Sequence, residues 1–271
     1  MLPLPNTFKF ITETQRSTDF KQLIMNNILA AFIFLTRLPF WKIKEVPAEA
    51  FKHVVPYWSL VGWLTGGIMA GILWLTGQIL PVSLAWIMAI IARLLITGCL
   101  HEDGLADFFD GFGGGTSKER TLAIMKDSHI GSYGVIGLIF YFLLILQLRD
   151  LPLNLLCALV FSGDCWSKFC ASQIVNFLPY ARREEESKAK VVYNRMSKGE
   201  WTVALICGVL PFVLFLPMKM WPALLFPVLT FFLLCRLMKQ RLQGYTGDCC
   251  GATFLLCELS FYIGSLIINY I

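Results

Sequence analysis

The sequence predicts an all-α fold: a polytopic membrane bundle of about seven spans, with a short re-entrant or interfacial helix near the N-terminus. Of the 271 residues, 56% are hydrophobic and only 15% are charged, whereas an average soluble domain carries about 25% charged residues. The mean hydropathy is +0.65, and the apolar residues gather in runs long enough to cross a bilayer. These observations exclude an ordinary soluble globular domain.

The apolar runs divide the chain into a predicted cytoplasmic N-terminal arm, residues 1–25, and one transmembrane catalytic domain, residues 26–271. The run at 26–41 has about 16 residues, or ~24 Å of helix, which is less than the ~30 Å hydrocarbon core. We therefore expect it to re-enter the membrane or lie at its surface. Gly62 and Gly66 form a GxxxG pattern that allows close helix packing. The predicted spans are 54–79, 82–100, 133–148, 152–178, 201–217, 221–238 and 251–271.

The basic residues set the predicted orientation. Lysines and arginines gather before the first span, after the second, in the loop at 179–200 and before the last span. The alternate connections near 80, 150 and 219 carry at most one basic residue each. The positive-inside rule then places the basic loops of this multi-pass protein in the cytoplasm. Nine cysteines without metal-type spacing are expected to be reduced and buried.

The most polar motif, HEDGLADFFDGFGGG at 101–115, follows the second span directly. In a helix, Asp103, Asp107 and Asp110 stand at i, i+4 and i+7, within about 60° of arc on one face. The three negative charges of this stripe repel one another, and Mg²⁺ bound together with a phosphate-bearing substrate would neutralise them. Glu102 is a further candidate ligand. The alternative is a solvated acidic turn, but carboxylates at the membrane are costly, at ~2.5–3.5 kcal/mol each in mid-bilayer.

Two further motifs carry polar residues. In IMKDSHIGSYG at 124–134, Lys126 and His129 are spaced to hold a phosphate and Asp127 to join the metal shell. The alternative there is a membrane anchor and a helix cap. In GYTGDCCGA at 244–252, Asp248 opens the last span, where helix N-terminal amides bind anions.

Ionisable residues inside the spans need partners. Arg93 and Glu258 are two of them. Asp164 and Lys168 stand at i, i+4, so we expect a salt bridge between them. Lys168 also lies in the predicted cytoplasmic half of its helix, within reach of a phosphate.

In this order, and together with FLTRLP at 34–39 and Tyr180-Ala-Arg182, these motifs resemble the cobalamin synthase family, the adenosylcobinamide-GDP ribazoletransferases. The resemblance covers nearly the whole chain from about residue 26. It implies a phosphotransferase that joins adenosylcobinamide-GDP to α-ribazole or its 5′-phosphate, releases GMP and requires Mg²⁺. It also implies these two substrates and membrane lipid as partners, with no nucleic acid. A homo-oligomer or a complex with other cobalamin-assembly enzymes stays open.

The residues suggest how this chemistry is divided. Asp103, Asp107 and Asp110 hold one or two Mg²⁺ ions, with Glu102 as an additional ligand. Asp248 completes the shell or accepts the proton of the ribazole hydroxyl, and Arg182 is a weaker candidate for a phosphate contact. The predicted substrate contacts are Arg37, His101, Lys126, Asp127, His129, Lys168 and Thr246.

Three other classes compete with this interpretation. A CDP-alcohol phosphotransferase of lipid synthesis uses similar chemistry, but its acidic pattern is absent because Asp110-Gly111 continues as Phe-Gly. A prenyltransferase typically carries two Asp-rich repeats. An ion-coupled transporter would favour charges near mid-span and inverted repeats, whereas here the charges gather at one predicted face.

Overall fold

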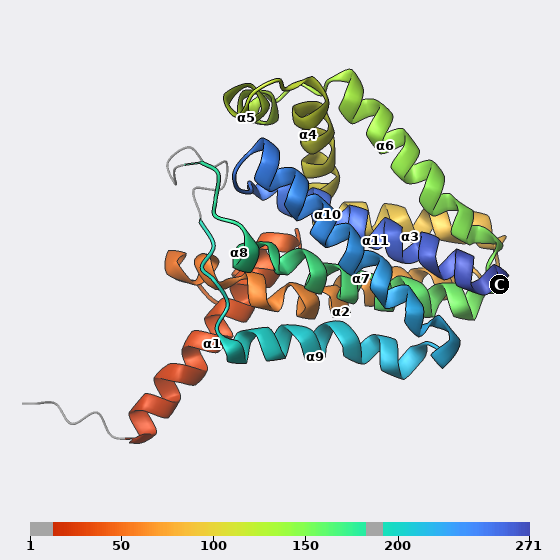
Figure 1. The fold of residues 1–271 in the computed structure, drawn as a ribbon. Helices are drawn as coiled ribbons and strands as arrows, with labels where there is room; N and C mark the ends of the chain where they lie inside the picture. The colour runs from red at the N-terminus through yellow and green to blue at the C-terminus, as the bar shows by residue number, and fades with distance from the viewer. Residues whose placement is uncertain (1–12, 183–191) are drawn as a thin grey trace, which may run out of the picture.

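The computed structural model describes residues 13–182 and 192–271, and these residues form helices and no strand. This confirms the all-α prediction. Figure 1 shows the helices stacked as a bundle, with α4 and α5 at one edge. The α-helices are α1 (Glu13–Leu35), α2 (Trp58–Thr76), α3 (Val82–Thr97), α4 (Leu100–Gly114), α5 (Lys118–Lys126), α6 (Ser132–Ile145), α7 (Leu153–Ser172), α8 (Ile174–Phe177), α9 (Lys198–Phe215), α10 (Leu225–Arg241) and α11 (Gly247–Tyr270). The 3₁₀ segments include η1 (Phe40–Lys42), η2 (Ala48–His53), η3 (Val55–Tyr57), η4 (Leu146–Asp150) and η6 (Met218–Leu224).

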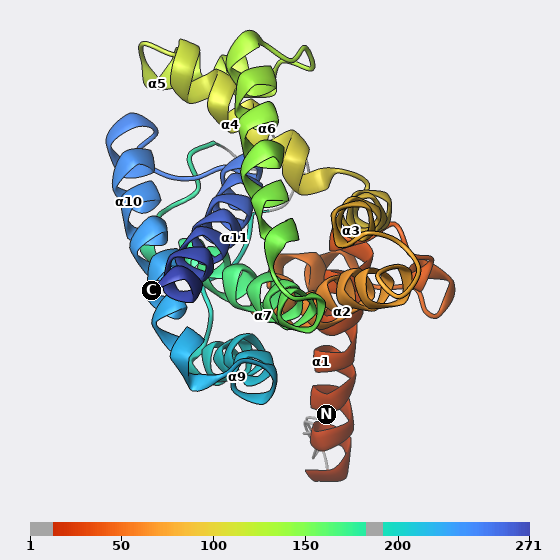
Figure 2. The same ribbon diagram turned by 90° about the vertical axis from the view of Figure 1, so that its right-hand side faces the viewer.

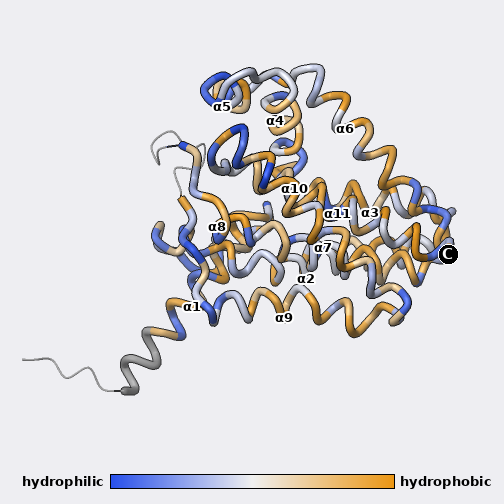
Figure 3. Tube along the Cα trace, in the orientation of Figure 1, coloured by the Kyte–Doolittle hydropathy of each residue, from blue (hydrophilic) through white to orange (hydrophobic). Residues whose placement is uncertain are grey.

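Among the described residues, five helical segments are long and apolar enough to cross a membrane, and the number rises to six if the bent pair of α3 and α4 is one span. The five are Val55–Thr76, Ser132–Asp150, Lys198–Phe215, Met218–Arg241 and Gly247–Tyr270. Large apolar side chains such as Ile139 of α6, Ile206 of α9 and Leu233 of α10 are exposed on their outer faces. Figure 3 shows hydrophobic stretches along these helices and hydrophilic residues toward the ends of the bundle. The chain is therefore a multi-pass membrane protein.

Helix α7 lies at the centre, where it packs against α2, α9 and α11. The half of α7 that is predicted to lie toward the cytoplasm carries the Asp164–Lys168 pair. This pair is buried inside the bundle and does not face lipid. The GxxxG glycines of α2 form the contact with α7. A Cβ at Gly66 would lie 2.9 Å from the Asp164 Cβ, and one at Gly62 would lie 2.9 Å from the Cys165 Cα. The two helices approach this closely because neither position has a side chain.

The acidic stretch does not continue the second predicted span, 82–100. Helix α3 ends at Thr97, and α4 leaves it at an angle of 89°. Two successive left-handed residues make this corner, Gly98 with φ 64° and Cys99 with φ 58°. A Cβ at Gly98 would overlap the Arg37 side chain, 1.8 Å from its Nε, so glycine is required here for space as well as for φ.

Residues 26–35 of the predicted short helix form the second half of a longer helix, and residues 36–41 lie beyond its end. Helix α1 runs without a break from Glu13 to Leu35, through the predicted boundary at residue 25, and its apolar part is Phe20–Leu35. In Figures 1 and 2 the N-terminal half of α1 extends away from the bundle. The division into an arm and a catalytic domain stays a prediction, and residues 1–12 lie outside the described part.

Candidate active site

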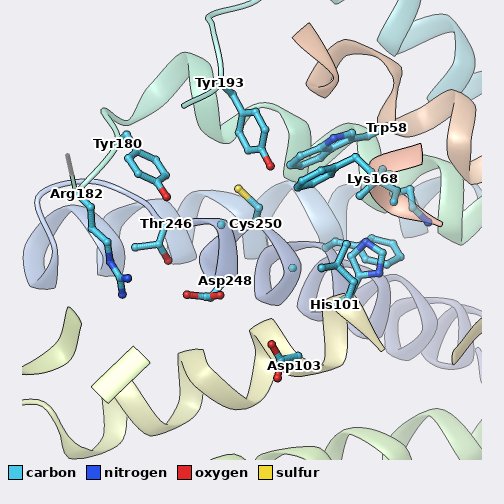
Figure 4. Close-up of a pocket in the computed structure, with 16 residues that line it drawn as sticks. Trp58, His101, Asp103, Lys168, Tyr180, Arg182, Tyr193, Thr246, Asp248 and Cys250 are labelled. Atoms are coloured by element: carbon cyan, nitrogen blue, oxygen red, sulfur yellow. The ribbon is translucent and has the colours of Figure 1, made fainter. Parts of the chain in front are cut away.

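A pocket of about 150 Å³ opens where the start of α11 meets α4, and segments far apart in the sequence line it. Figure 4 shows side chains from α2, α4, α7, α11 and the loops around residues 180 and 193 directed toward this space. The lining residues are Phe34, Leu35, Trp58, Leu100, His101, Asp103, Lys168, Tyr180, Arg182, Tyr193, Thr246, Gly247, Asp248, Cys250, Gly251 and Phe254.

Two glycines let α4 and α11 cross in backbone contact beside the pocket. A Cβ at Gly104 would lie 3.0 Å from the carbonyl oxygen of Asp248. Three residues along, a Cβ at Gly251 would lie 3.2 Å from the Cα of His101. This crossing brings Asp103 and Asp248 to the same pocket, and Figure 4 shows their carboxylates on facing sides of the opening.

Hydrogen bonds fix the first residues of α11 and the segment just before it. The Thr246 hydroxyl accepts from the Cys249 amide at 3.3 Å and caps the helix. The Tyr245 amide donates to the Pro179 carbonyl at 3.0 Å, and the Ala181 amide donates to the Tyr245 carbonyl at 2.8 Å. These bonds tie the segment 179–181 to α11, so that Arg182 enters the pocket beside Asp248 (Figure 4).

Lys168 supplies a buried positive charge at the opposite end of the pocket from Arg182 (Figure 4). Its side chain is almost fully buried, and its ammonium contacts the Asp164 carboxylate, which confirms the predicted salt bridge. The ammonium also donates to the Thr65 hydroxyl at 3.0 Å and lies 4.1 Å from the centre of the Phe254 ring. Lys168 is thus held by neighbours and still borders the pocket.

The three aspartates of α4 lie on one helix, as the spacing predicted, but their surroundings differ. Asp103 lines the pocket. Asp110 is buried and accepts from the backbone amides of Gly131 at 2.6 Å and Gly134 at 2.8 Å, where it caps the start of α6. Asp107 is buried between them and does not line the pocket.

Glu102 faces the interior of the bundle rather than the pocket. Its carboxylate lies 3.6 Å from the Arg93 guanidinium. Arg93 in turn places Nη1 2.6 Å from both carboxylate oxygens of Glu258. The hydroxyls of Tyr141 and Tyr262 each donate to Glu258 at 3.0 Å. Each of the two ionisable residues, Arg93 and Glu258, thereby has the partner that its position in an apolar helix requires.

The predicted phosphate contacts at the end of α5 lie elsewhere on the surface. Lys126, Asp127 and His129 are exposed and do not line the pocket. Asp127 is the C-cap of α5, and His129 Nδ1 lies 2.7 Å from its carboxylate. The hydrogen bonds from His129 lower the pKa of Asp127. Arg37 is also exposed and packs at the α3–α4 corner, beside the pocket rather than in it.

Of the other predicted substrate contacts, His101, Lys168 and Thr246 line the pocket. The aromatic lining was not predicted at all: Trp58, Tyr193 and Phe254. Trp58 and Phe254 stand inside apolar runs, where core packing explains an aromatic residue equally well, and Tyr193 is a single aromatic residue in the basic loop at 179–200. Tyr180 had a signal, because it belongs to the segment quoted for the family resemblance.

The carboxylates at the pocket suit a Mg²⁺ ion that also has ligands from the substrate. Within residues 13–182 and 192–271, no three His, Cys, Asp or Glu side chains converge as a metal site. Asp103 and Asp248 are the two carboxylates at the pocket. Mg²⁺ commonly uses one or two carboxylates together with substrate phosphates and water. The residues therefore fit an ion that binds with the substrate rather than one held by the protein alone.

Comparisons with known proteins identify the family of the chain. The chain matches the cobalamin-5-phosphate synthase family over residues 27–266. It is 38% identical to an adenosylcobinamide-GDP ribazoletransferase of Shewanella amazonensis, over 89% of this chain and 94% of the relative. It is 33% identical to the protein of the same name from Leptospira interrogans, over 88% of this chain and 94% of the relative. The search of solved structures returned no match. Because the family match covers most of the sequence and the relatives align along almost their whole length, the chain belongs to the cobalamin-5-phosphate synthase family.

Proposed function

We propose that this protein is a membrane-bound transferase that joins adenosylcobinamide-GDP to α-ribazole, or to its 5′-phosphate, with release of GMP. The product is adenosylcobalamin or its 5′-phosphate. The observation that carries this proposal beyond the family match is the pocket itself. Asp103 and Asp248, which come from separate helices, line it together with the cations Arg182 and Lys168. A diphosphate needs cations of this kind, and an attacking alcohol needs a group that takes its proton.

The reaction is a displacement at one phosphorus of the diphosphate. A ribose hydroxyl of the acceptor attacks the phosphorus that bears the cobinamide. The bond from that phosphorus to the bridging oxygen breaks, and GMP leaves with the electron pair. Asp248 accepts the hydroxyl proton, and Arg182 contacts the diphosphate. Catalysis of this type depends mainly on positioning and on stabilising charge.

The same site would hold Mg²⁺ between its carboxylates and the substrate. Asp103 is the first candidate ligand and Asp248 the second, since both line the pocket. Bound Mg²⁺ would neutralise charge on the diphosphate and on the leaving GMP. Asp107, Asp110 and Glu102 do not line the pocket, so our proposal does not count them among the Mg²⁺ ligands.

We place the pocket on the cytoplasmic side of the bacterial inner membrane. The bundle end that carries the pocket also carries Arg182, Lys198, Lys239 and Arg241. The opposite end, near η4 and η6, carries Arg149 and Lys219. The positive-inside rule supports this orientation.

The test is turnover by purified protein in lipid nanodiscs with Mg²⁺, adenosylcobinamide-GDP and α-ribazole. We expect GMP and adenosylcobalamin in equal amounts. GMP release without cobalamin would indicate a hydrolase, and no release of GMP in the presence of either acceptor would overturn the proposal. Running both α-ribazole and its 5′-phosphate decides which acceptor is preferred.

A further inference from the structure

The inner wall of the pocket is aromatic. Trp58, Tyr193 and Phe254 are buried there, and Tyr193 contacts Trp58 edge-on, with ring centroids 5.9 Å apart. Among the described lining residues the carboxylates are Asp103 and Asp248. Asp103 is exposed and Asp248 is half-buried, so both belong to the mouth. The pocket thus has a charged mouth and an apolar, ring-lined interior.

Trp58 differs from the other buried tryptophans. The Trp86 indole N–H donates to the Ile145 carbonyl at 2.9 Å, and that of Trp166 donates to the Leu224 carbonyl at 3.1 Å. Trp58 is only 4% exposed, and its indole nitrogen has no hydrogen-bond partner in the described part of the chain. A buried donor without a partner is costly and calls for an explanation.

His101 presents a second unpaired nitrogen at the same wall. Its side chain is buried, and Nδ1 has no partner among the residues that the structure describes. The ring packs against Phe254, with centroids 4.7 Å apart. The wall has two further polar groups: the Tyr193 hydroxyl, and the Lys168 ammonium, which is already engaged by Asp164 and Thr65. The wall therefore offers rings for stacking and unpaired nitrogens for one or two hydrogen bonds.

We propose that this aromatic inner wall, made by Trp58, Tyr193, Phe254 and His101, binds the base of the acceptor. The inference rests on the function proposed above, in which the acceptor is α-ribazole. The base of α-ribazole is a dimethylated benzimidazole, a flat bicyclic ring with an apolar edge and one free ring nitrogen that accepts a hydrogen bond. With the base inside, the ribose points to the mouth, where Asp103 and Asp248 lie.

The other two parts of the substrates fit this wall less well. Guanine carries N–H donors on its pairing edge, and they need acceptors. At the wall, the Trp58 indole N–H can only donate and the Lys168 ammonium is already engaged, while the carboxylates, the strongest acceptors, stand at the mouth. The corrin ring is far larger than a cavity of about 150 Å³, so it stays outside the pocket. The benzimidazole is the planar group whose single acceptor matches the wall.

The first test compares Trp58→Phe with wild type in steady-state turnover. Phe keeps an aromatic ring and removes the indole N–H. We expect the KM for α-ribazole to rise about 10-fold, the size of one hydrogen bond, with the KM for adenosylcobinamide-GDP unchanged within about twofold. Trp63→Phe is the matched control, because its N–H donates to the Cys207 carbonyl outside the pocket. It should leave both KM values near those of wild type.

An acceptor analogue makes the test specific to the hydrogen bond. In a dimethylindole riboside, a C–H group replaces the free ring nitrogen of the base. Wild type and Trp58→Phe should use this analogue with the same KM. A Trp58→Phe effect of equal size on both acceptors, or a rise in the donor KM instead, would overturn the assignment.

A measurement on the wild-type protein covers the case in which the variant fails to fold. Free 5,6-dimethylbenzimidazole should inhibit competitively toward α-ribazole and not toward adenosylcobinamide-GDP. Competition with the donor alone would place the base elsewhere. Wild-type turnover of both substrates separates the two proposals: without it the function fails, whereas turnover with the wrong inhibition pattern rejects only the base site.

Discussion

Gly104 of α4 lies directly against the backbone of Asp248 at the start of α11, where a Cβ would stand 3.0 Å from the Asp248 carbonyl oxygen. The contact is between backbones, so no side chain can adjust to relieve it. It sets how far apart the two helices lie, and these helices carry the two carboxylates of the pocket. The glycine therefore controls the separation of Asp103 and Asp248.

Replacing Gly104 by alanine should reduce kcat about 10- to 100-fold, because a shift of a fraction of an ångström to 1 Å in catalytic groups costs this much. Turnover in nanodiscs measures the effect. Gly71→Ala is the matched control, since Gly71 lies within α2 and a Cβ there meets nothing within 4 Å. It should keep full activity and leave stability equal or slightly higher. Equal activity of the two variants would show that α4 and α11 can move apart without disturbing the catalytic carboxylates.

Asp103→Asn and Asp248→Asn should each lower kcat by about 10²–10³-fold, the loss typical of one electrostatic contact to a transition state. Both side chains are at the mouth, so the change should leave the melting temperature close to that of wild type. If the carboxylates bind Mg²⁺, the Mg²⁺ concentration for half-maximal activity should also rise. A variant with near-normal activity and unchanged Mg²⁺ dependence would remove that residue from the site.

Asp110→Asn should act differently, through stability. Its two carboxylate oxygens accept from the amides of Gly131 and Gly134, and an amide side chain can replace only one of these acceptors. We expect a loss of about 1.5–3 kcal/mol of unfolding free energy, the usual size for a hydrogen bond to a charged group. Chemical denaturation in detergent micelles measures it. Asp127→Asn, an exposed cap on the neighbouring helix, should have a much smaller effect. A fully stable Asp110→Asn protein would contradict the capping role.

The contrast between Asp103 and Asp110 shows what the sequence can predict. Helical periodicity correctly places these residues on one helix, because it depends only on local geometry. What packs against each position depends on tertiary contacts: one end of the face meets α11 and the pocket, and the other meets the start of α6. The pattern therefore predicted an acidic helix but not the separate roles along it.

The corner before α4 and the aromatic wall could not be predicted from the sequence, for different reasons. Cys99 adopts a left-handed conformation that a non-glycine residue rarely takes, so only Gly98 gave a signal for the break. Trp58 and Phe254 come from apolar helices, where aromatic residues mostly serve as core. Charged residues were more informative: the Asp164–Lys168 pair followed from i, i+4 spacing. The Arg93–Glu258 pair did not, since 165 positions separate its members.

That distant pair supports a last prediction. Arg93 joins α3 to Glu258 of α11, and its second amino group donates to the Tyr141 hydroxyl of α6 at 2.8 Å. Arg93→Met leaves two buried carboxylates, Glu258 and the nearby Glu102, without their cation, so we expect a loss of about 3–5 kcal/mol. Arg93→Met combined with Glu258→Gln leaves only the Glu102 charge uncompensated and should recover at least half of that loss. The measurement is unfolding in mixed micelles for the two single variants and the double. If the double variant were no more stable than Arg93→Met alone, the destabilisation would come from lost packing of the long Arg93 side chain rather than from an uncompensated charge.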